Sequence, residues 1–163
     1  MHTAFDHTTG QWQIEWPGRV ARHDLVYLSP PDDPLTGLLL GNGELGVLCY
    51  VSGSKLIFVI NRSDLWDDGP PEAFNCAAAE EEERHTTLRH GGRVSIDFKV
   101  PLFELIYLTD FQARLSLADA RIGLSAEGPF GAVSLDAFVS WHQDIFFCEI
   151  RQRLSDRTIP LEI

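Results

Sequence analysis

The 163-residue sequence predicts an all-β fold, an antiparallel β-sandwich. Short apolar segments rich in Val, Ile, Phe and Leu recur along the chain, and Gly- and Ser-containing turn signals separate them. Within 111–117, apolar residues alternate with Gln112, Arg114 and Ser116. This period of two is typical of an antiparallel strand with one face in water. Many short strands of this kind favour two packed sheets.

The chain divides into an N-terminal arm over 1–20, polar and Trp-bearing, and a sandwich domain over 21–163. Within the sandwich, apolar content and bounding turn residues predict ten strands. They span 24–28, 37–40, 45–52, 56–61, 92–98, 103–108, 111–117, 121–126, 131–140 and 145–154.

One segment, 70–89, does not fit the strand pattern. Its stretch 77–84 consists of three alanines, four glutamates and an arginine, which are good helix formers without β-branching. We expect a short surface helix or a loop insertion here, and a helix content below roughly 15% for the whole chain. The adjacent glutamates repel one another and should be solvated.

Two polar segments stand out for function. The first is the Gly-Asn-Gly sequence at 41–43, which lies between apolar runs and predicts a tight turn with Asn42 in a left-handed conformation. The second is 61–69, where a strand runs into a loop with Trp66 and three carboxylates. A tryptophan beside carboxylates suits sugar binding, because the ring covers the apolar sugar face and the acids meet its hydroxyls.

The two polar segments should be neighbours in space. The link 52–55 is a short turn, so the strands before and after it should form an antiparallel hairpin. The hairpin would place Asn42 and Glu44 beside Asn61, Arg62 and Asp64. Glu44 would then either accept hydrogen bonds from the backbone or pair with Arg62.

These motifs resemble a known family. Residues 40–46 (Leu-Gly-Asn-Gly-Glu-Leu-Gly) and 61–67 (Asn-Arg-Ser-Asp-Leu-Trp-Asp) are similar to motifs in the N-terminal β-sandwich of family 95-like glycoside hydrolases of the α-L-fucosidase type, and in a related uncharacterised glycosidase-associated N-terminal domain. The match spans 22–69, with a weaker match over 111–117.

The resemblance implies part of a super-sandwich that packs on an (α/α)6 barrel. The catalytic acids of the family lie in the barrel, so the resemblance implies no catalytic residue in this chain. It implies a non-catalytic domain that supports the barrel and shapes its carbohydrate cleft. The residues expected to line that cleft are Asn42, Glu44, Arg62, Asp64, Trp66 and Asp67. Because sandwiches of the family are larger than this chain, we expect a fragment or shortened form of a longer glycosidase.

Alternative roles remain for the same residues. Asp64 and its neighbours could serve ordinary turn chemistry, with Asp64 bonding its own backbone as an Asx-turn. Trp66 is either a sugar platform or a plug between the sheets, and we expect it to be at least partly buried. A stand-alone carbohydrate-binding module using Trp12, Trp66 or Trp141 is a second function, and a structural or assembly domain without a ligand is a third.

Composition narrows the partners. With 24 acidic and 13 basic residues the net charge is −11, which disfavours nucleic acid and anionic membrane surfaces. No apolar stretch is long enough for a membrane helix. No leader is visible at the start, so we expect a cytoplasmic protein, or a secreted or periplasmic one that has lost its leader. A sheet edge left open would invite pairing with another chain, a route to a homo-oligomer.

We expect no cofactor and no metal site. The histidines are scattered without metal-ligand spacing, and Gly41, Gly43 and Gly46 precede a strand rather than a nucleotide-binding helix. The three cysteines predict no disulfide framework. We expect Cys49 and Cys148 to be buried thiols and Cys76 to lie in an exposed loop.

Overall fold

The computed structural model describes residues 5–6, 8–12, 16–67 and 87–155, and the statements below concern these residues. Its elements in chain order are β1 (Phe5–Asp6), β2 (Gln11–Trp12), α1 (Trp16–Val20), the 3-10 turn η1 (Ala21–His23), β3 (Leu25–Tyr27), the 3-10 turn η2 (Pro34–Thr36), β4 (Leu38–Gly41), β5 (Leu45–Ser52), β6 (Lys55–Arg62), β7 (Trp66–Asp67), β8 (Thr87–Leu88), β9 (Gly92–Asp97), β10 (Asp110–Ser116), β11 (Arg121–Gly128), β12 (Gly131–Val139) and β13 (Phe146–Leu154).

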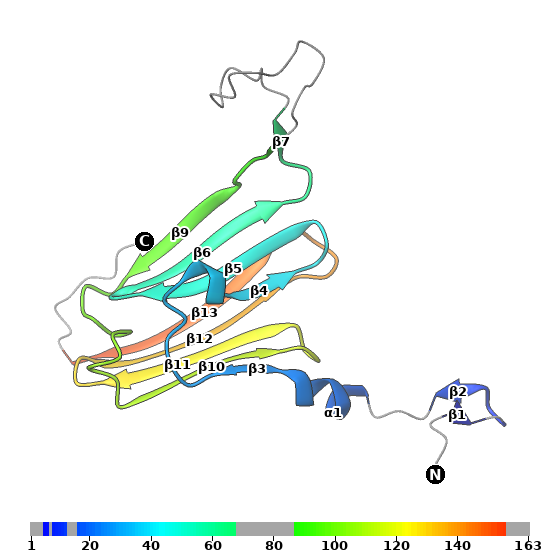
Figure 1. Cartoon of the computed structure of the whole chain (residues 1–163), viewed down its shortest axis with the longest axis horizontal. Coiled ribbons are helices and arrows are strands. Elements are labelled where there is room, and N and C mark those ends of the chain that lie inside the picture. The colour runs from blue at the N-terminus through cyan, green and yellow to red at the C-terminus, as the bar shows by residue number, and fades with distance from the viewer. Residues whose placement is uncertain (1–4, 7, 13–15, 68–86, 156–163) are drawn as a thin grey trace.

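The fold is an antiparallel β-sandwich, which confirms the predicted fold class. One sheet has five strands in the order β13-β12-β11-β10-β3, and the other has four in the order β4-β5-β6-β9. Figure 1 shows the two sheets as separate layers, with the small β1–β2 pair lying apart from them near the N-terminus. A further two-residue pair, β7–β8, extends beyond the four-stranded sheet.

The chain crosses between the layers twice. Residues 28–37 lead from β3 to β4, and residues 98–109 lead from β9 back to β10. The first crossing is fixed where the Val51 N–H donates to the Pro31 carbonyl at 3.0 Å. Asp33 caps η2 by accepting a 2.8 Å hydrogen bond from the Leu35 N–H. After the second crossing, β10 to β13 form a simple meander.

Alternating side chains build the core between the layers. Val47, Cys49 and Val51 of β5 face inward and are 0–1% exposed. Phe58 of β6 meets Phe146 of β13 across the gap, with ring centroids 5.0 Å apart. Each fully buried large apolar side chain of this kind contributes about 1.5–3 kcal/mol of transfer free energy.

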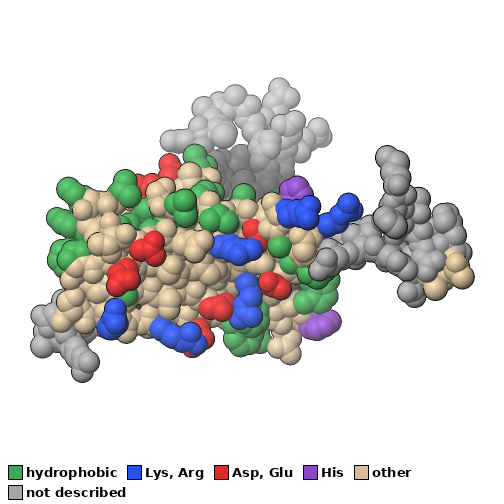
Figure 2. Space-filling view, turned by 90° about the horizontal axis from the view of Figure 1, so that it is seen from below, with side chains coloured by type: hydrophobic (Ala, Val, Ile, Leu, Met, Phe, Trp, Pro, Cys, Tyr) green, Lys and Arg blue, Asp and Glu red, His purple; other side chains and the backbone are tan. Residues whose placement is uncertain are grey.

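The outer faces of the two sheets differ in character. The five-stranded sheet presents charged side chains of both signs among small polar residues, as Figure 2 shows. The four-stranded sheet instead presents a cross-strand row of Leu39, Leu48 and Val59, of which Leu39 is 65% exposed. The outer face of the five-stranded sheet at β10 is therefore the polar face that the alternation in 111–117 predicts.

Nine of the ten predicted strands are present, and their ends differ from the predicted ones by at most two residues. The exception is 103–108, where the prediction is wrong. Its apolar run forms turns, in which the Tyr107 N–H donates to the Glu104 carbonyl at 2.9 Å. Phe103 anchors the segment in the core at 3% exposure, whereas Leu105 and Ile106 point into solvent.

Two further differences concern short elements. The arm contains the five-residue helix α1, which is too short for a periodic pattern to reveal. In the insertion expected at 70–89, Thr87 and Leu88 form β8, paired with β7. The predicted helix at 77–84 and Cys76 lie outside the described residues.

Candidate functional site

The turn between β4 and β5 is built on Gly43 and Asn42. Gly43 has φ +98°, the position where a type II′ hairpin turn uses glycine. Asn42 is not left-handed, so that prediction is wrong. Its side-chain oxygen instead accepts hydrogen bonds from the Glu44 N–H at 3.0 Å and the Leu45 N–H at 2.8 Å. The asparagine therefore closes the turn through its side chain, and the glycine supplies the unusual backbone angle.

The side-chain amide of Asn42 also reaches the other sheet. It donates to the carbonyls of Ser140 at 3.1 Å and Gln143 at 3.4 Å, and to Asp144 Oδ1 at 3.1 Å. All three acceptors belong to the loop between β12 and β13. The turn of one sheet is thus fastened to a loop of the other.

Arg62, the last residue of β6, joins the same group. Its guanidinium donates to both carboxylate oxygens of Asp64, from Nε at 2.9 Å and from Nη2 at 3.1 Å. Its Nη1 lies 3.0 Å from Asp144 Oδ2. The hydrogen bond and charge of Asp64, followed by the charge of Asp144, raise the pKa of Arg62. We call Asn42, Arg62, Asp64 and Asp144 the Asn42 cluster.

The register of β5 and β6 places the two sequence motifs side by side, as predicted. Leu45 pairs with Arg62, and the Ser63 N–H donates to the Glu44 carbonyl at 2.9 Å. Asn61 lies on the same edge, where its side-chain oxygen accepts from the Gly91 N–H at 3.0 Å. A hollow of about 270 Å³ lies between the motifs. Within the described residues, Arg62 pairs with Asp64 and Asp144 rather than with Glu44.

Trp66 stands at the margin of the cluster and is 57% exposed, so it is not a plug between the sheets. Its indole N–H donates to the Ser63 carbonyl at 2.7 Å, which fixes the ring against the turn after β6. The backbone of Asp67 continues β7 opposite Thr87. The Asp64 carboxylate binds Arg62 and takes no part in an Asx-turn.

Sequence reasoning missed the contribution of the β12–β13 loop to this site. Asp144 is a full member of the cluster, and Ser140 and Gln143 contribute carbonyl groups. Trp141 follows directly after Ser140 and is 77% exposed. The only signal was the polar and aromatic composition of 140–144 between two strands. Nothing local reveals its contact with residue 42.

The charged side chains of the Asn42 cluster pair with one another, since Arg62 binds both Asp64 and Asp144. Trp66 and Glu44 are exposed beside them. Across the described parts of the chain, no group of three His, Cys, Asp or Glu side chains could hold a metal ion.

The two described cysteines differ from each other. Cys49 is buried as predicted, and burial raises the pKa of its thiol to about 12. Cys148 is exposed, so the prediction of a buried thiol is wrong there, although partial desolvation still raises its pKa to about 11. The reason is its place on β13, the edge strand of its sheet, where no further described strand covers it.

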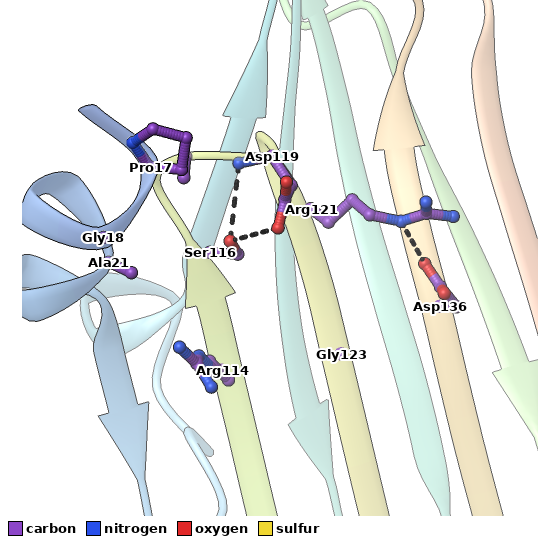
Figure 3. Close-up of a pocket in the computed structure, with 10 residues that line it drawn as sticks. Pro17, Gly18, Ala21, Arg114, Ser116, Asp119, Arg121, Gly123 and Asp136 are labelled. Atoms are coloured by element: carbon purple, nitrogen blue, oxygen red, sulfur yellow. Dashed lines mark hydrogen bonds and ion pairs between the residues drawn. The ribbon is translucent and has the colours of Figure 1, made fainter. Parts of the chain in front are cut away.

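A second hollow, of about 500 Å³, lies on the polar face of the five-stranded sheet beside α1 (Figure 3). Arg121 and Asp136 on its floor are joined at 2.9 Å, and the Ser116 hydroxyl donates to Asp119 at 2.9 Å. Arg114 is held by Asp24 at 2.6 Å. Its polar groups are thus committed to local structure.

Comparison of the chain with protein-family models gives no match, and comparison with curated proteins gives none either. The glycosidase resemblance of 40–46 and 61–67 therefore stays a prediction. Among the described residues, no helix has the length and apolar character needed to cross a membrane.

Proposed function

We propose that this chain is a non-catalytic β-sandwich domain of a glycoside hydrolase, and that its Asn42 cluster borders the carbohydrate cleft formed with a helical-barrel catalytic domain. One observation carries the proposal. The two sequence segments that resemble the glycosidase domain, 40–46 and 61–67, form one polar edge with an exposed indole beside it. If segments 40–46 and 61–67 resembled the family only because both form turns, the resemblance would give no reason for the exposure of the Trp66 side chain.

The chemistry of this edge suits a neutral sugar. The Trp66 ring is fixed by its N–H bond to Ser63 and offers an apolar face to a pyranose ring. Arg62 and Asp64, 40% and 63% exposed at their side chains, can meet sugar hydroxyls as donor and acceptor. Because these groups are paired before ligand arrives, little side-chain freedom would be lost on binding.

The same geometry favours a role without catalysis. A glycosidase needs a carboxylic acid to protonate the leaving group and a second carboxyl group roughly 5–10 Å away. Asp64 and Asp144 are both bound to Arg62, which holds them as ion-pair partners rather than as proton donors. The catalytic acid and base are assigned to the barrel domain.

The test uses the complete reading frame that carries this chain. Hydrolysis of aryl fucosides, galactosides and xylosides is measured for wild type and for Trp66→Ala and Arg62→Met. We expect KM to rise roughly tenfold or more, the effect of one lost recognition contact, with a smaller change in kcat. The control is Leu105→Ala, an exposed residue near the Gly53 turn at the opposite end of the sandwich. A reading frame without a catalytic domain, or variants that match wild type, would overturn the proposal.

A stand-alone carbohydrate-binding module is the second candidate, and the exposure of both Trp66 and Trp141 favours it. The Asn42 cluster joins the turn after β6 to the β12–β13 loop, so both indoles stand at one end of the sandwich. Titration of the isolated chain with oligosaccharides, followed by tryptophan fluorescence, separates the two candidates. Saturable binding lost in both Trp66→Ala and Trp141→Ala supports the module. Absence of binding by the isolated chain leaves the domain proposal in place.

A further inference from the structure

Strand β13 ends the five-stranded sheet with an edge that no described strand covers. It is nine residues long, Phe-Phe-Cys-Glu-Ile-Arg-Gln-Arg-Leu, and its burial pattern is largely exposed. Edge strands are normally protected by proline, by charged side chains such as lysine, by a bulge or shortness, or by an inward-pointing charge. Of these devices β13 has only outward-pointing charges, which are Glu149, Arg151 and Arg153. Its register with β12 is continuous and its inward row lacks charge. The opposite edge, β3, is only three residues long.

The free hydrogen-bonding groups of this edge can be assigned. The Ser140 N–H donates to the Ile145 carbonyl and the Ser155 N–H donates to the Phe130 carbonyl, one at each end of the β12–β13 ladder. Along an antiparallel strand, the backbone N–H and C=O groups of successive residues point alternately to one neighbouring strand and to the other. The backbone groups of the odd-numbered residues of β13 therefore form the hydrogen bonds with β12. The N–H and C=O groups of Phe146, Cys148, Ile150, Gln152 and Leu154 point to the open edge.

We propose that two copies of this chain associate through β13, antiparallel and about a two-fold axis at Ile150, to form one continuous sheet. In this register Ile150 faces Ile150 of the second copy as a hydrogen-bonded pair. Residue 148 then faces 152, and residue 146 faces 154. All the free edge groups of β13 are paired in the same way in both copies, as a closed two-fold interface requires.

Charge complementarity on the outer face selects this register. It places Glu149 opposite Arg151 of the second copy, and Arg151 opposite the second Glu149. These are non-hydrogen-bonded pairs, in which side chains approach most closely. Within one chain the same two residues already form an ion pair at 2.7 Å. Glu149 also stands opposite Asp136 of β12, so a second arginine would offset that like-charge neighbour.

The remaining outer pair extends an aromatic row. Phe147 stacks on Phe138 with centroids 5.0 Å apart, and the Arg121 guanidinium lies 5.1 Å from the Phe138 centroid. The register brings Arg153 of the second copy opposite Phe147, which is 46% exposed in the single chain. The arginine can then cover the free side of the row by a cation–π contact.

The inner row also fits a second copy. Phe146, Cys148, Ile150, Gln152 and Leu154 carry no charge, and Cys148 is exposed although it faces the interior of the sandwich. A neighbouring strand would cover this thiol with Gln152 of the second copy. Pairing along β13 therefore buries apolar surface and satisfies edge amides in one step.

The test is sedimentation equilibrium of the chain over a concentration series, without any sugar. Wild type should sediment at twice the mass of the chain. Glu149→Arg and Arg151→Glu should each raise the dimer dissociation constant about tenfold or more, because each creates two like-charge contacts. The double variant restores opposite charges across the axis and should return to the wild-type mass. Gln112→Arg, exposed on the same sheet face of β10, is the control and should remain dimeric.

A cross-link tests the register independently. The Ile150→Cys variant, with Cys76 and Cys148 replaced by serine, should form a disulfide-linked dimer on mild oxidation. The Cα atoms of facing residues in a hydrogen-bonded pair lie about 5.5 Å apart, a separation that a disulfide can span. Ser134→Cys on the outer face of β12 should not form this dimer. Circular dichroism checks that each variant is folded. A wild-type monomer at all concentrations, or single charge reversals that leave the dimer intact, would overturn the proposal.

Discussion

Asn42, in the β4–β5 turn, donates a 3.1 Å hydrogen bond to Asp144, which lies 102 residues later in the β12–β13 loop of the other sheet. The same side chain closes its own turn by accepting from the N–H groups of Glu44 and Leu45. One residue therefore sets the hairpin that presents the first motif and fixes that hairpin against the β12–β13 loop. Arg62 reaches the same Asp144 from the second motif.

Asn42→Asp should destabilise the protein by about 1–3 kcal/mol at neutral pH, because a donor is replaced by a carboxylate beside Asp144 and the Ser140 carbonyl. Adding Asp144→Asn to that variant should recover part of the loss, since an amide would again face a carboxylate. Urea unfolding curves of the two single variants and the double variant give the coupling free energy. Strict additivity of the two changes would show that the contact is not energetically significant.

Gly43→Val should cost about 1–3 kcal/mol, because a β-branched residue resists the positive φ of +98° at this position. No heavy atom lies within 4 Å of the position of an added Cβ, so the cost comes from the backbone rather than from a clash. Gly123→Val is the matched control. It also has open space around its Cβ, but it lies in β11 without a positive φ. Equal melting temperatures for the two variants would contradict the assignment.

Much of this fold follows from the sequence because the signals are local. The β5–β6 hairpin is defined by two apolar strands and a short Gly-containing turn, and its register placed Arg62 beside Leu45 as expected. The pairing of Asn42 with Asp144 has no such signal, since it depends on how two sheets stack. The run 103–108 is misleading for a related reason. Its hydrophobicity serves to anchor a layer crossing through Phe103, while the residues after Phe103 form turns.

Stability should fall in acid through Asp24. Its side chain is 2% exposed. The pKa of Asp24 is lowered first by the hydrogen bond that its carboxylate accepts from the Leu117 N–H at 2.9 Å, and then by the hydrogen bond from Arg114. A lowered folded-state pKa means that its contribution is fully present above the unfolded value of about 3.9 and is lost as pH falls through the folded value. The pKa of Asp97 is lowered in the same direction, by the Lys99 N–H and then the Ser54 hydroxyl.

The measurement is the melting temperature between pH 2 and pH 7, a range of about five units that spans the carboxylate pKa values. Asp24→Asn should lower the melting temperature at pH 7 and flatten its decline below about pH 4. Asp24→Asn combined with Asp97→Asn should flatten it further. A double variant with the same acid slope as wild type would show that other carboxylates control the acid transition.

The isolated chain should not hydrolyse aryl fucosides, galactosides or xylosides. Asp64 and Asp144 are both engaged by Arg62, and the described residues offer no free pair of carboxyl groups at this end of the sandwich. The assay compares wild type with Asp64→Asn and Asp67→Asn, so that a trace contaminant shows equal rates in all three. Turnover by wild type that either substitution abolishes would move the catalytic acid into this chain.

The short strand β3 is the least firmly attached strand of the five-stranded sheet. Among the described strands it pairs only with β10, through three residues, whereas β10 to β13 are joined by successive local hairpins. Its closure depends on residues about ninety positions apart, and Asp24, bound to Arg114 and Leu117, holds its start. Because closing so long a loop is entropically costly, the meander can form first and β3 can dock last. Protonation of Asp24 would then release the N-terminal segment while the meander remains folded, and in amide hydrogen exchange at low pH the amides of β3 should lose protection before those of β11 and β12.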